Sequence, residues 1–159
     1  MSAAMVAFVG RNNELVYAAP ELHSIDLMHI VWCALDVFDE RQRVSAQSQS
    51  SSSEQSPYLG VLMIMEGYAA YGFLTNTGTK IIMLLELDAA EKLEAANPSS
   101  SEASSSSSPP SSMEKLFLAV YRAYVDAVSN PFLPLGASPA TEPNCAFERR
   151  IRQLIVHKN

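Results

Sequence analysis

The sequence predicts an α+β fold in which a five-stranded, mainly antiparallel sheet carries one helix on one face and two on the other. Two serine-rich tracts, Ser45–Pro57 and Pro98–Ser112, separate three blocks with strong apolar patterning. Within these blocks the pattern predicts elements in the order β-β-α-β-β-β-α-α. The strand segments are apolar with little alternation, which is typical of a sheet that is buried on both faces. Helices must therefore cover both sides of this sheet.

The first block, from Met1 to about Val44, begins with a predicted hairpin. Ala3–Val9 is a short apolar run with the composition of a buried strand. Residues 10–13 (Gly-Arg-Asn-Asn) tolerate positive φ and predict a turn. Leu15–Ala18 then predicts the second strand of the hairpin.

The same block continues with a helix, predicted from about Glu21 to Arg43. Its expected core-facing row is Ile25, Met28, Trp32 and Leu35, widened by Leu27, Val31 and Ala34. Its opposite face carries a narrow polar stripe: Asp26, His29, Cys33, Asp36 and Glu40. We expect one face to be buried and the stripe to remain available to solvent or to a partner.

The second block, from Tyr58 to about Leu93, predicts a three-stranded antiparallel meander. Its strands are Tyr58–Met65, Tyr68–Asn76 and Lys80–Leu87, joined by tight turns at Glu66-Gly67 and Thr77-Gly78. The two serine tracts bury too little apolar surface to offset the entropy of ordering. They predict flexible loop insertions, at 45–57 and 98–112, within one domain that spans residues 1–159.

The third block, from Met113 to Asn159, predicts two helices. Ser111–Glu114 fits a capping box. The helix that follows is expected to end near Ser129, because Pro131 cannot continue it. Its expected core row is Leu116, Val120, Tyr124 and Val128, beside Phe117 and Tyr121. The last helix is predicted at about Cys145–His157, with Phe147, Ile151, Leu154 and Ile155 on one face and arginines on the other.

Composition narrows the class of protein. The chain has 159 residues, 48% of them apolar, which is enough for one packed core. Its net charge of −6 argues against a nucleic-acid partner, because phosphate binding needs a field of basic residues. No segment reaches the length of a membrane span, and the N-terminus lacks the pattern of a signal peptide. The two cysteines, Cys33 and Cys145, are expected to be reduced, as in a cytosolic protein.

No pattern in the sequence predicts catalysis, a cofactor or a metal. Asp26, His29, Cys33 and Asp36 share one helix face, but such a face alone rarely completes a tetrahedral metal shell. Cys33 beside His29 is the only local nucleophile–base pair, and an ordinary helical cysteine is the simpler interpretation. The glycines match no phosphate-binding loop. We therefore expect the polar stripe to be a solvated or partner-facing surface.

Two features near the C-terminus leave alternatives open. Asn130-Pro131-Phe132 is similar to the short peptide that endocytic domains recognise, but we favour a helix end whose Phe132 packs back into the core. Arg149, Arg150 and Arg152 belong to a basic end of an acidic chain. They form either the solvated face of an amphipathic helix or a contact with acidic lipid or an acidic partner.

Several short segments together point to a known family. They are Leu35–Glu40, Tyr58–Gly60, Tyr71–Asn76, Lys80–Leu85, Asn130–Phe132 and Ala146–Glu148. In this order, and with this order of elements, the chain resembles the longin, or SNARE-like, fold. Within that fold it resembles the sedlin-like small subunits of the TRAPP vesicle-tethering complex. Asp36 and Asp39 match the acidic pair of that family near the end of the first helix.

The resemblance implies a non-enzymatic role in complex assembly, in ER-to-Golgi and intra-Golgi transport. It implies other TRAPP subunits as partners, an indirect effect on a Rab GTPase, and a cytoplasmic location peripheral to ER and Golgi (cis-Golgi, perinuclear) membranes. The expected partner interface comprises Asp26, His29, Cys33, Asp36, Asp39 and Glu40. Two alternatives stay open: a longin-type regulator that binds a SNARE or coat-protein peptide beside the first helix, and a small enzyme that uses Cys33.

Overall fold

A computed structural model of the chain describes residues 3–19, 25–47, 57–87, 111–134, 137–140 and 145–155. Within these residues the predicted order of elements is confirmed. The elements are β1 (Ala3–Val9), β2 (Leu15–Ala19), α1 (Ile25–Gln47), β3 (Tyr58–Met65), β4 (Tyr68–Leu74), β5 (Lys80–Glu86), α3 (Ser112–Val128) and α4 (Ala146–Ile155). None of the described helices is long and apolar enough to cross a membrane.

The observed bounds of the helices differ from the predicted ones at a few ends. Helix α1 continues to Gln47, three residues into the first predicted loop. The rest of that loop up to residue 56, and residues 98–110 of the second loop, lie outside the described residues. The same holds for the predicted start of the first helix before Ile25 and for the predicted end of the last helix after Ile155.

The five strands form one antiparallel sheet in the order β2-β1-β5-β4-β3. Tight turns join β1 to β2, β3 to β4 and β4 to β5, as the sequence predicts. Gly67 and Gly78 adopt positive φ in the last two turns, which a residue with a Cβ rarely does. The long-range pairing is that of β1 with β5, which places the first strand of the chain inside the sheet, between β2 and the central strand β5.

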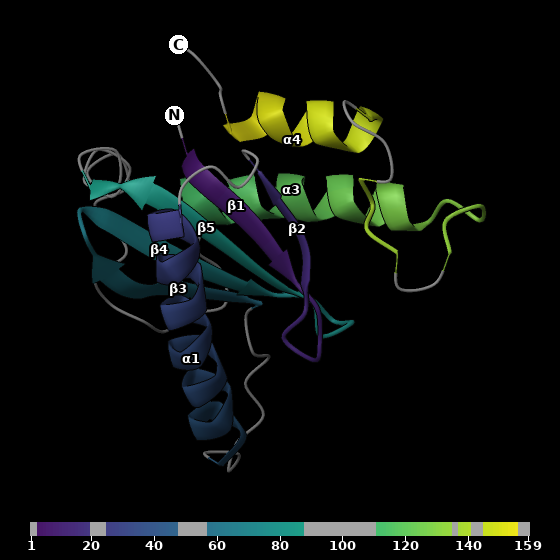
Figure 1. The fold of residues 1–159 in the computed structure, drawn as a ribbon. Helices are drawn as coiled ribbons and strands as arrows, with labels where there is room; N and C mark the ends of the chain where they lie inside the picture. The colour runs from purple at the N-terminus through teal and green to yellow at the C-terminus, as the bar shows by residue number, and fades with distance from the viewer. Residues whose placement is uncertain are drawn as a thin grey trace.

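Two hydrophobic cores lie on opposite faces of this sheet. Alternate residues of β1 and β5 enter each core: Val6, Phe8, Ile81 and Met83 on one side, and Met5, Ala7, Ile82 and Leu84 on the other. Helices α3 and α4 cover the first core and α1 covers the second (Figure 1). The predicted arrangement of one helix against two is thus confirmed.

The predicted inward row of α1 is wrong at two positions. Ile25 is 86% exposed and Trp32 is 42% exposed. The buried residues of α1 are instead Met28, Ile30, Val31, Ala34, Leu35 and Phe38. Almost every position between 27 and 38 is apolar, so spacing alone cannot choose the inward row. Packing selects the orientation that buries Phe38 completely and turns Trp32 outward.

Helix α3 shows a similar shift of its predicted face. Its fully packed residues are Met113, Phe117, Val120 and Ala123, whereas Val128 at its end is 38% exposed. One of the two hydrogen bonds of the predicted capping box is confirmed: the backbone N–H of Glu114 donates to Ser111 Oγ at 3.1 Å. The predicted face of α4 is confirmed: Phe147, Ile151 and Ile155 are buried and Leu154 is half-buried.

A side chain from α1 binds the backbone of the edge strand β3. The register between β3 and β4 shifts twice, and Leu59 and Leu62 have no paired residue in β4 at these irregularities. Arg41 donates to the backbone oxygen of Leu59 at 2.9 Å and to that of Leu62 at 3.5 Å. One guanidinium therefore satisfies two carbonyl groups that the strand ladder leaves free, and it joins α1 to the sheet edge.

Substitution Phe117→Ala tests the core beneath α3. The Phe117 ring is fully buried and stacks on Phe73, with ring centroids 5.6 Å apart. We expect a loss of about 3–5 kcal/mol in the free energy of unfolding, measured by urea denaturation. The control is Val125→Ala on the exposed side of the same helix, with an expected change below about 1 kcal/mol. A loss under 1 kcal/mol for Phe117→Ala would show that this core is not the one described.

Candidate partner-binding surface

The outward face of α1 combines apolar and acidic side chains. Ile25, His29, Trp32, Asp36 and Glu40 are all exposed. At 100° per residue their directions fall within one third of the helix circumference, and Asp36 lies near the middle. We call these five residues the α1 outer face. Trp32 lies one helical turn before Asp36, so an exposed indole stands beside a carboxylate.

The predicted interface residues differ in how exposed they are. Asp26, His29, Asp36 and Glu40 are exposed, as predicted, and Cys33 is half-buried at the margin of the α1 outer face. Glu40 also forms a surface ion pair with Arg43 at 3.7 Å. The sequence pattern places Trp32 and Ile25 in the core, so it does not predict them as part of this surface. A signal for their exposure was nevertheless present, because both lie three or four residues from the polar residue His29, and Trp32 lies four residues before Asp36.

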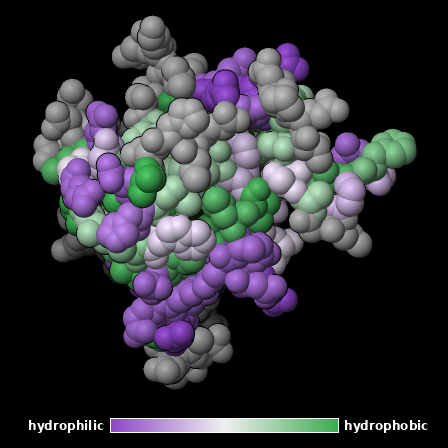
Figure 2. Space-filling model, in the orientation of Figure 1, coloured by the Kyte–Doolittle hydropathy of each residue, from purple (hydrophilic) through white to green (hydrophobic). Residues whose placement is uncertain are grey.

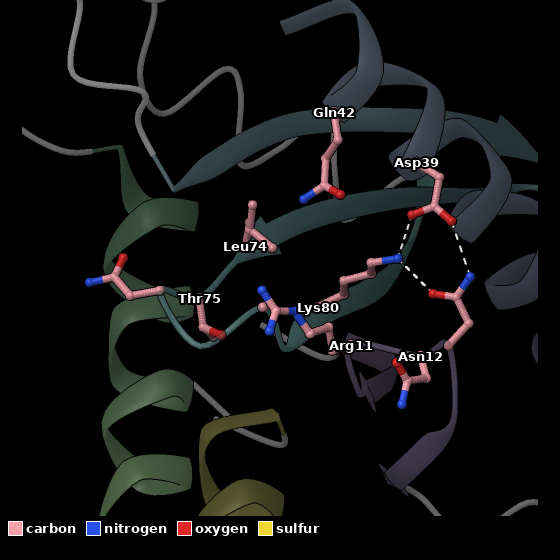
Figure 3. Close-up of a pocket in the computed structure, with 10 residues that line it drawn as sticks. Arg11, Asn12, Asp39, Gln42, Leu74, Thr75 and Lys80 are labelled. Carbon is pink, nitrogen blue, oxygen red and sulfur yellow. Dashed lines mark hydrogen bonds and ion pairs between the residues drawn. The ribbon is translucent and has the colours of Figure 1, made fainter. Parts of the chain in front are cut away.

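Asp39 differs from the other predicted residues because it belongs to a partly buried hydrogen-bond network. Lys80 at the start of β5 has a side chain that is only 7% exposed. Its Nζ donates to Asp39 and to Asn13 Oδ1, the latter at 2.6 Å (Figure 3). Asn13 Nδ2 in turn donates to Asp39 Oδ2 at 3.1 Å. The network connects the β1–β2 turn, α1 and β5, so Asp39 has a structural role in this fold.

Two opposing effects act on the pKa of Asp39. Partial burial raises it, but hydrogen bonds from Lys80 and Asn13 and the positive charges of Lys80 and Arg43 lower it by more. The net pKa of Asp39 lies below its ordinary value of 3.8. A carboxylate whose pKa is lowered on folding stabilises the fold fully at pH values above its ordinary pKa. The stabilisation is lost as the pH falls through the folded-state pKa.

An open polar cleft of about 560 Å³ lies around this network. It is lined by Arg11, Asn12, Asn13, Asp39, Gln42, Leu74, Thr75, Asn76, Gly78 and Lys80 (Figure 3). The described lining residues include no cysteine, histidine or serine, and the Thr75 hydroxyl donates to the backbone oxygen of Thr79 at 2.9 Å. Among these lining residues, no cysteine, serine or threonine is therefore paired with a histidine base, and the Lys80 amine already donates to Asp39 and Asn13.

The Cys33–His29 pair that the sequence singles out does come together. Cys33 Sγ lies 3.7 Å from His29 Nε2, one turn apart on α1. In the described part of the chain no carboxylate hydrogen-bonds the His29 ring, so a third group that would orient the base is missing there. Among the same residues no group of three or more His, Cys, Asp or Glu side chains is placed to hold a metal ion.

The three arginines of α4 are partly neutralised within the protein. Arg150 forms an ion pair with Asp126 of α3 at 2.6 Å, and Arg152 pairs with the buried Glu148 one turn earlier. Arg149 is exposed, and no ion pair of its side chain occurs among the described residues. The basic face predicted from the sequence thus carries less free positive charge than the residue count implies.

Comparison with known proteins gives a consistent result. A family model described as Sedlin matches residues 8–157. The chain is 26% identical over 156 residues to the trafficking protein particle complex subunit 2-like protein of Xenopus tropicalis, covering 97% of each chain. The protein of the same name from Rattus norvegicus is 24% identical over 156 residues, again with 97% of each chain covered. That from Dictyostelium discoideum is 26% identical over 133 residues, covering 80% of this chain and 79% of its own.

Substitutions at Asp39 and Lys80 test the network. Asp39→Asn leaves the buried Lys80 cation without its counter-charge, so we expect a loss of about 2–4 kcal/mol in the free energy of unfolding. Lys80→Met should cost less, because the Asp39 side chain keeps 27% of its surface in water. The double variant should recover part of the loss. Equal losses in the free energy of unfolding for the two single variants, with no recovery in the double variant, would contradict the described Asp39–Lys80 interaction.

The pH dependence of stability offers a separate test. Because the Asp39 pKa is lowered on folding, the wild-type chain should lose stability more steeply than Asp39→Asn as the pH falls from about 4 toward 2. The measurement is urea denaturation across this range. Parallel profiles for wild type and Asp39→Asn would refute a lowered pKa.

Proposed function

This chain belongs to the Sedlin family, and on that premise we propose that it is a non-enzymatic subunit of a trafficking protein particle complex. In this role it helps to assemble the complex that tethers vesicles in ER-to-Golgi and intra-Golgi transport. Its direct partners are other subunits of the complex, and its effect on a Rab GTPase is indirect. It acts at the cytoplasmic side of ER and Golgi membranes, held there by the complex.

The observation that carries this proposal is the extent of the match. The family model covers almost the whole chain, and the Xenopus tropicalis relative is covered over 97% of its length. That relative is named as a subunit of a trafficking protein particle complex. A shared fold does not by itself specify a function, because function lies in the sites that individual residues form on it. The role of this chain then depends on which of its own surfaces binds a neighbour.

We assign subunit binding to the α1 outer face. Interface centres favour tryptophan, and the Trp32 ring is exposed on a helix whose other side already fills the core. Asp36 and Glu40 next to it favour a partner surface that carries lysine or arginine. Asp26 and Cys33 border the same surface. Asp39 supports it from below, because its ion pair with Lys80 fixes α1 on the sheet.

An enzymatic role has weaker support. The Cys33–His29 pair lies on a convex helix surface, where water is not excluded from a reacting group. A thiol-reactive probe at neutral pH should label Cys33 no faster than a free peptide thiol.

The alternative of a longin-type regulator requires a groove beside α1 that accepts a SNARE or coat-protein peptide. The edge of β3 next to α1 is where such a peptide would add a strand. There Arg41 already bonds the oxygens of Leu59 and Leu62. A peptide would have to displace both bonds, so this observation favours the assembly role.

Membrane contact through α4 is a minor part of the proposal. Arg149 is available to acidic headgroups, while Arg150 and Arg152 already have carboxylate partners. A single free cation attracts an anionic membrane by only about 1 kcal/mol. We therefore propose that α4 supports, but does not determine, the association with membranes.

Substitutions Asp36→Tyr and Trp32→Ala test the interface. Both positions are exposed, so we expect folded proteins whose melting temperatures fall by no more than about 4 °C. Loss of a central tryptophan should weaken subunit binding by at least about 30-fold, the size of a typical hot spot. The measurement is affinity purification of the tagged chain, with quantitative mass spectrometry of co-purifying complex subunits.

The matched control is Ile64→Ala, an exposed apolar residue on the edge strand β3. It should leave the recovery of complex subunits unchanged. If Asp36→Tyr instead lowered the melting temperature by 10 °C or more, Asp36 would be structural and the interface assignment would fail. Recovery of SNARE or coat proteins in place of complex subunits would favour the regulator.

A further inference from the structure

The segment that follows α3 forms a closed turn with an unusual exposed residue. Helix α3 ends at Val128, and Ser129 is its C-cap. The backbone N–H of Phe132 donates to Asn130 Oδ1 at 3.1 Å, and the backbone N–H of Leu133 donates to the Asn130 backbone oxygen at 3.0 Å. Pro131 fixes φ between them. Asn130, Pro131 and Phe132 therefore occupy the first three positions of a hydrogen-bonded β-turn.

Phe132 does not pack into the core, so the favoured sequence interpretation of this segment is wrong. Its side chain is 91% exposed. The turn places its third residue on the outside, and Leu133 is the residue that becomes half-buried. Val125 and Val128, on the adjoining turn of α3, are also more than one third exposed. Figure 1 shows this turn extending away from the helices, and Figure 2 shows apolar surface projecting there.

We propose that this turn, which we call the Asn-Pro-Phe turn, is a preformed ligand for a protein module with an apolar pocket that accepts one aromatic ring. Phe132 is the side chain that enters the pocket, and Asn130 with Pro131 fixes the direction of the ring. The partner is thus a domain that recognises an uncharged Asn-Pro-Phe sequence in a turn. This inference goes beyond the subunit role and does not rest on it.

Preorganisation is the first reason. An exposed phenylalanine in a mobile segment loses conformational freedom on binding, which weakens the complex. Here two hydrogen bonds and a proline ring already restrict the backbone on both sides of Phe132. Only the ring torsions of Phe132 remain to be ordered. A linear peptide of the same sequence lacks this advantage, so the folded chain should bind the same pocket more tightly.

The surroundings of the turn favour a protein pocket over a lipid surface. Membrane-binding segments combine several apolar side chains with an excess of basic residues. Near the end of α3 the exposed Asp126 carboxylate takes up the charge of Arg150, with 2.6 Å between Oδ2 and Nη1. The two charges cancel, so this pair adds no net positive charge beside Phe132, whose ring is far more exposed than Val125 and Val128. A single ring matches a concave site of similar size, which a bilayer does not provide.

The location of the turn permits two partners at once. Helix α3 packs on the sheet face opposite to α1. The Asn-Pro-Phe turn therefore extends from the layer that lies across the sheet from the α1 outer face. A module bound at Phe132 would leave Trp32 and Asp36 free for another subunit. The chain could in this way connect a tethering complex to a further protein.

The test uses the full chain and a recombinant endocytic domain that is selected because it binds the linear peptide of residues 129–133. Isothermal titration should give a Kd for the folded chain at least about tenfold below that of the peptide. Phe132→Ala should abolish measurable binding, or weaken it at least about 50-fold. Because Phe132 is exposed, the melting temperature of the Phe132→Ala variant should equal that of the wild type.

Matched variants separate the turn from its surroundings. Val125→Ala removes an exposed apolar residue from the same helix and should change the Kd less than twofold. Pro131→Ala keeps the ring but relaxes the turn, and should bring the Kd toward that of the linear peptide. The proposal is overturned if the domain binds the peptide but not the folded chain, or if Phe132→Ala binds like wild type. It also fails if Phe132→Ala strips complex subunits from the purified protein, because Phe132 would then be an internal contact of that complex.

Discussion

Burial of β1 and β5 on both faces is the constraint on which the rest of this structure depends. Their residues alternate between two separate cores, so neither face of these two strands meets water. One face is covered by α1 and the other by α3 and α4. Each of these helices packs one of its own sides against the core. The opposite sides of α1 and α3 are left without a function in folding. Docking surfaces can develop there at little cost to stability.

A second interaction decides where α1 lies on its face. Lys80 begins the buried strand β5, and its amine cannot reach water easily. Asp39 from α1 and Asn13 from the first turn supply the missing charge and hydrogen bond. The same contact orients the helix, so that Phe38 faces the Lys80 amine, 5.7 Å from the ring centroid. With Phe38 inward, Trp32 must face outward. Packing of Phe38 and the Lys80–Asp39 pair are thus both compatible with the orientation of α1 that leaves Trp32 exposed.

Much of the architecture follows from local signals in the sequence. The bounds of β1 and β3 agree with the prediction because turn residues or prolines mark their ends, and the cap at Ser111 follows from its spacing to Glu114. The Asp39–Lys80 pair could not be foreseen, since its members are 41 residues apart. The orientation of α1 depends on long-range packing of the same kind, such as that of Phe38 in the core. Exposure of Phe132 depends on the direction of a turn, which composition does not specify. The sites were therefore predicted less well than the fold.

The bonds from Arg41 to Leu59 and Leu62 have a consequence for the covalent continuity of the chain. They attach the helix to the sheet edge through space, independently of the peptide segment that joins the two in sequence. A polypeptide that ends at residue 47 and another that begins at residue 57 would still share this attachment and the core beneath it. Such fragments should reassociate when co-expressed. The boundary between them offers a position for building a split reporter on this scaffold.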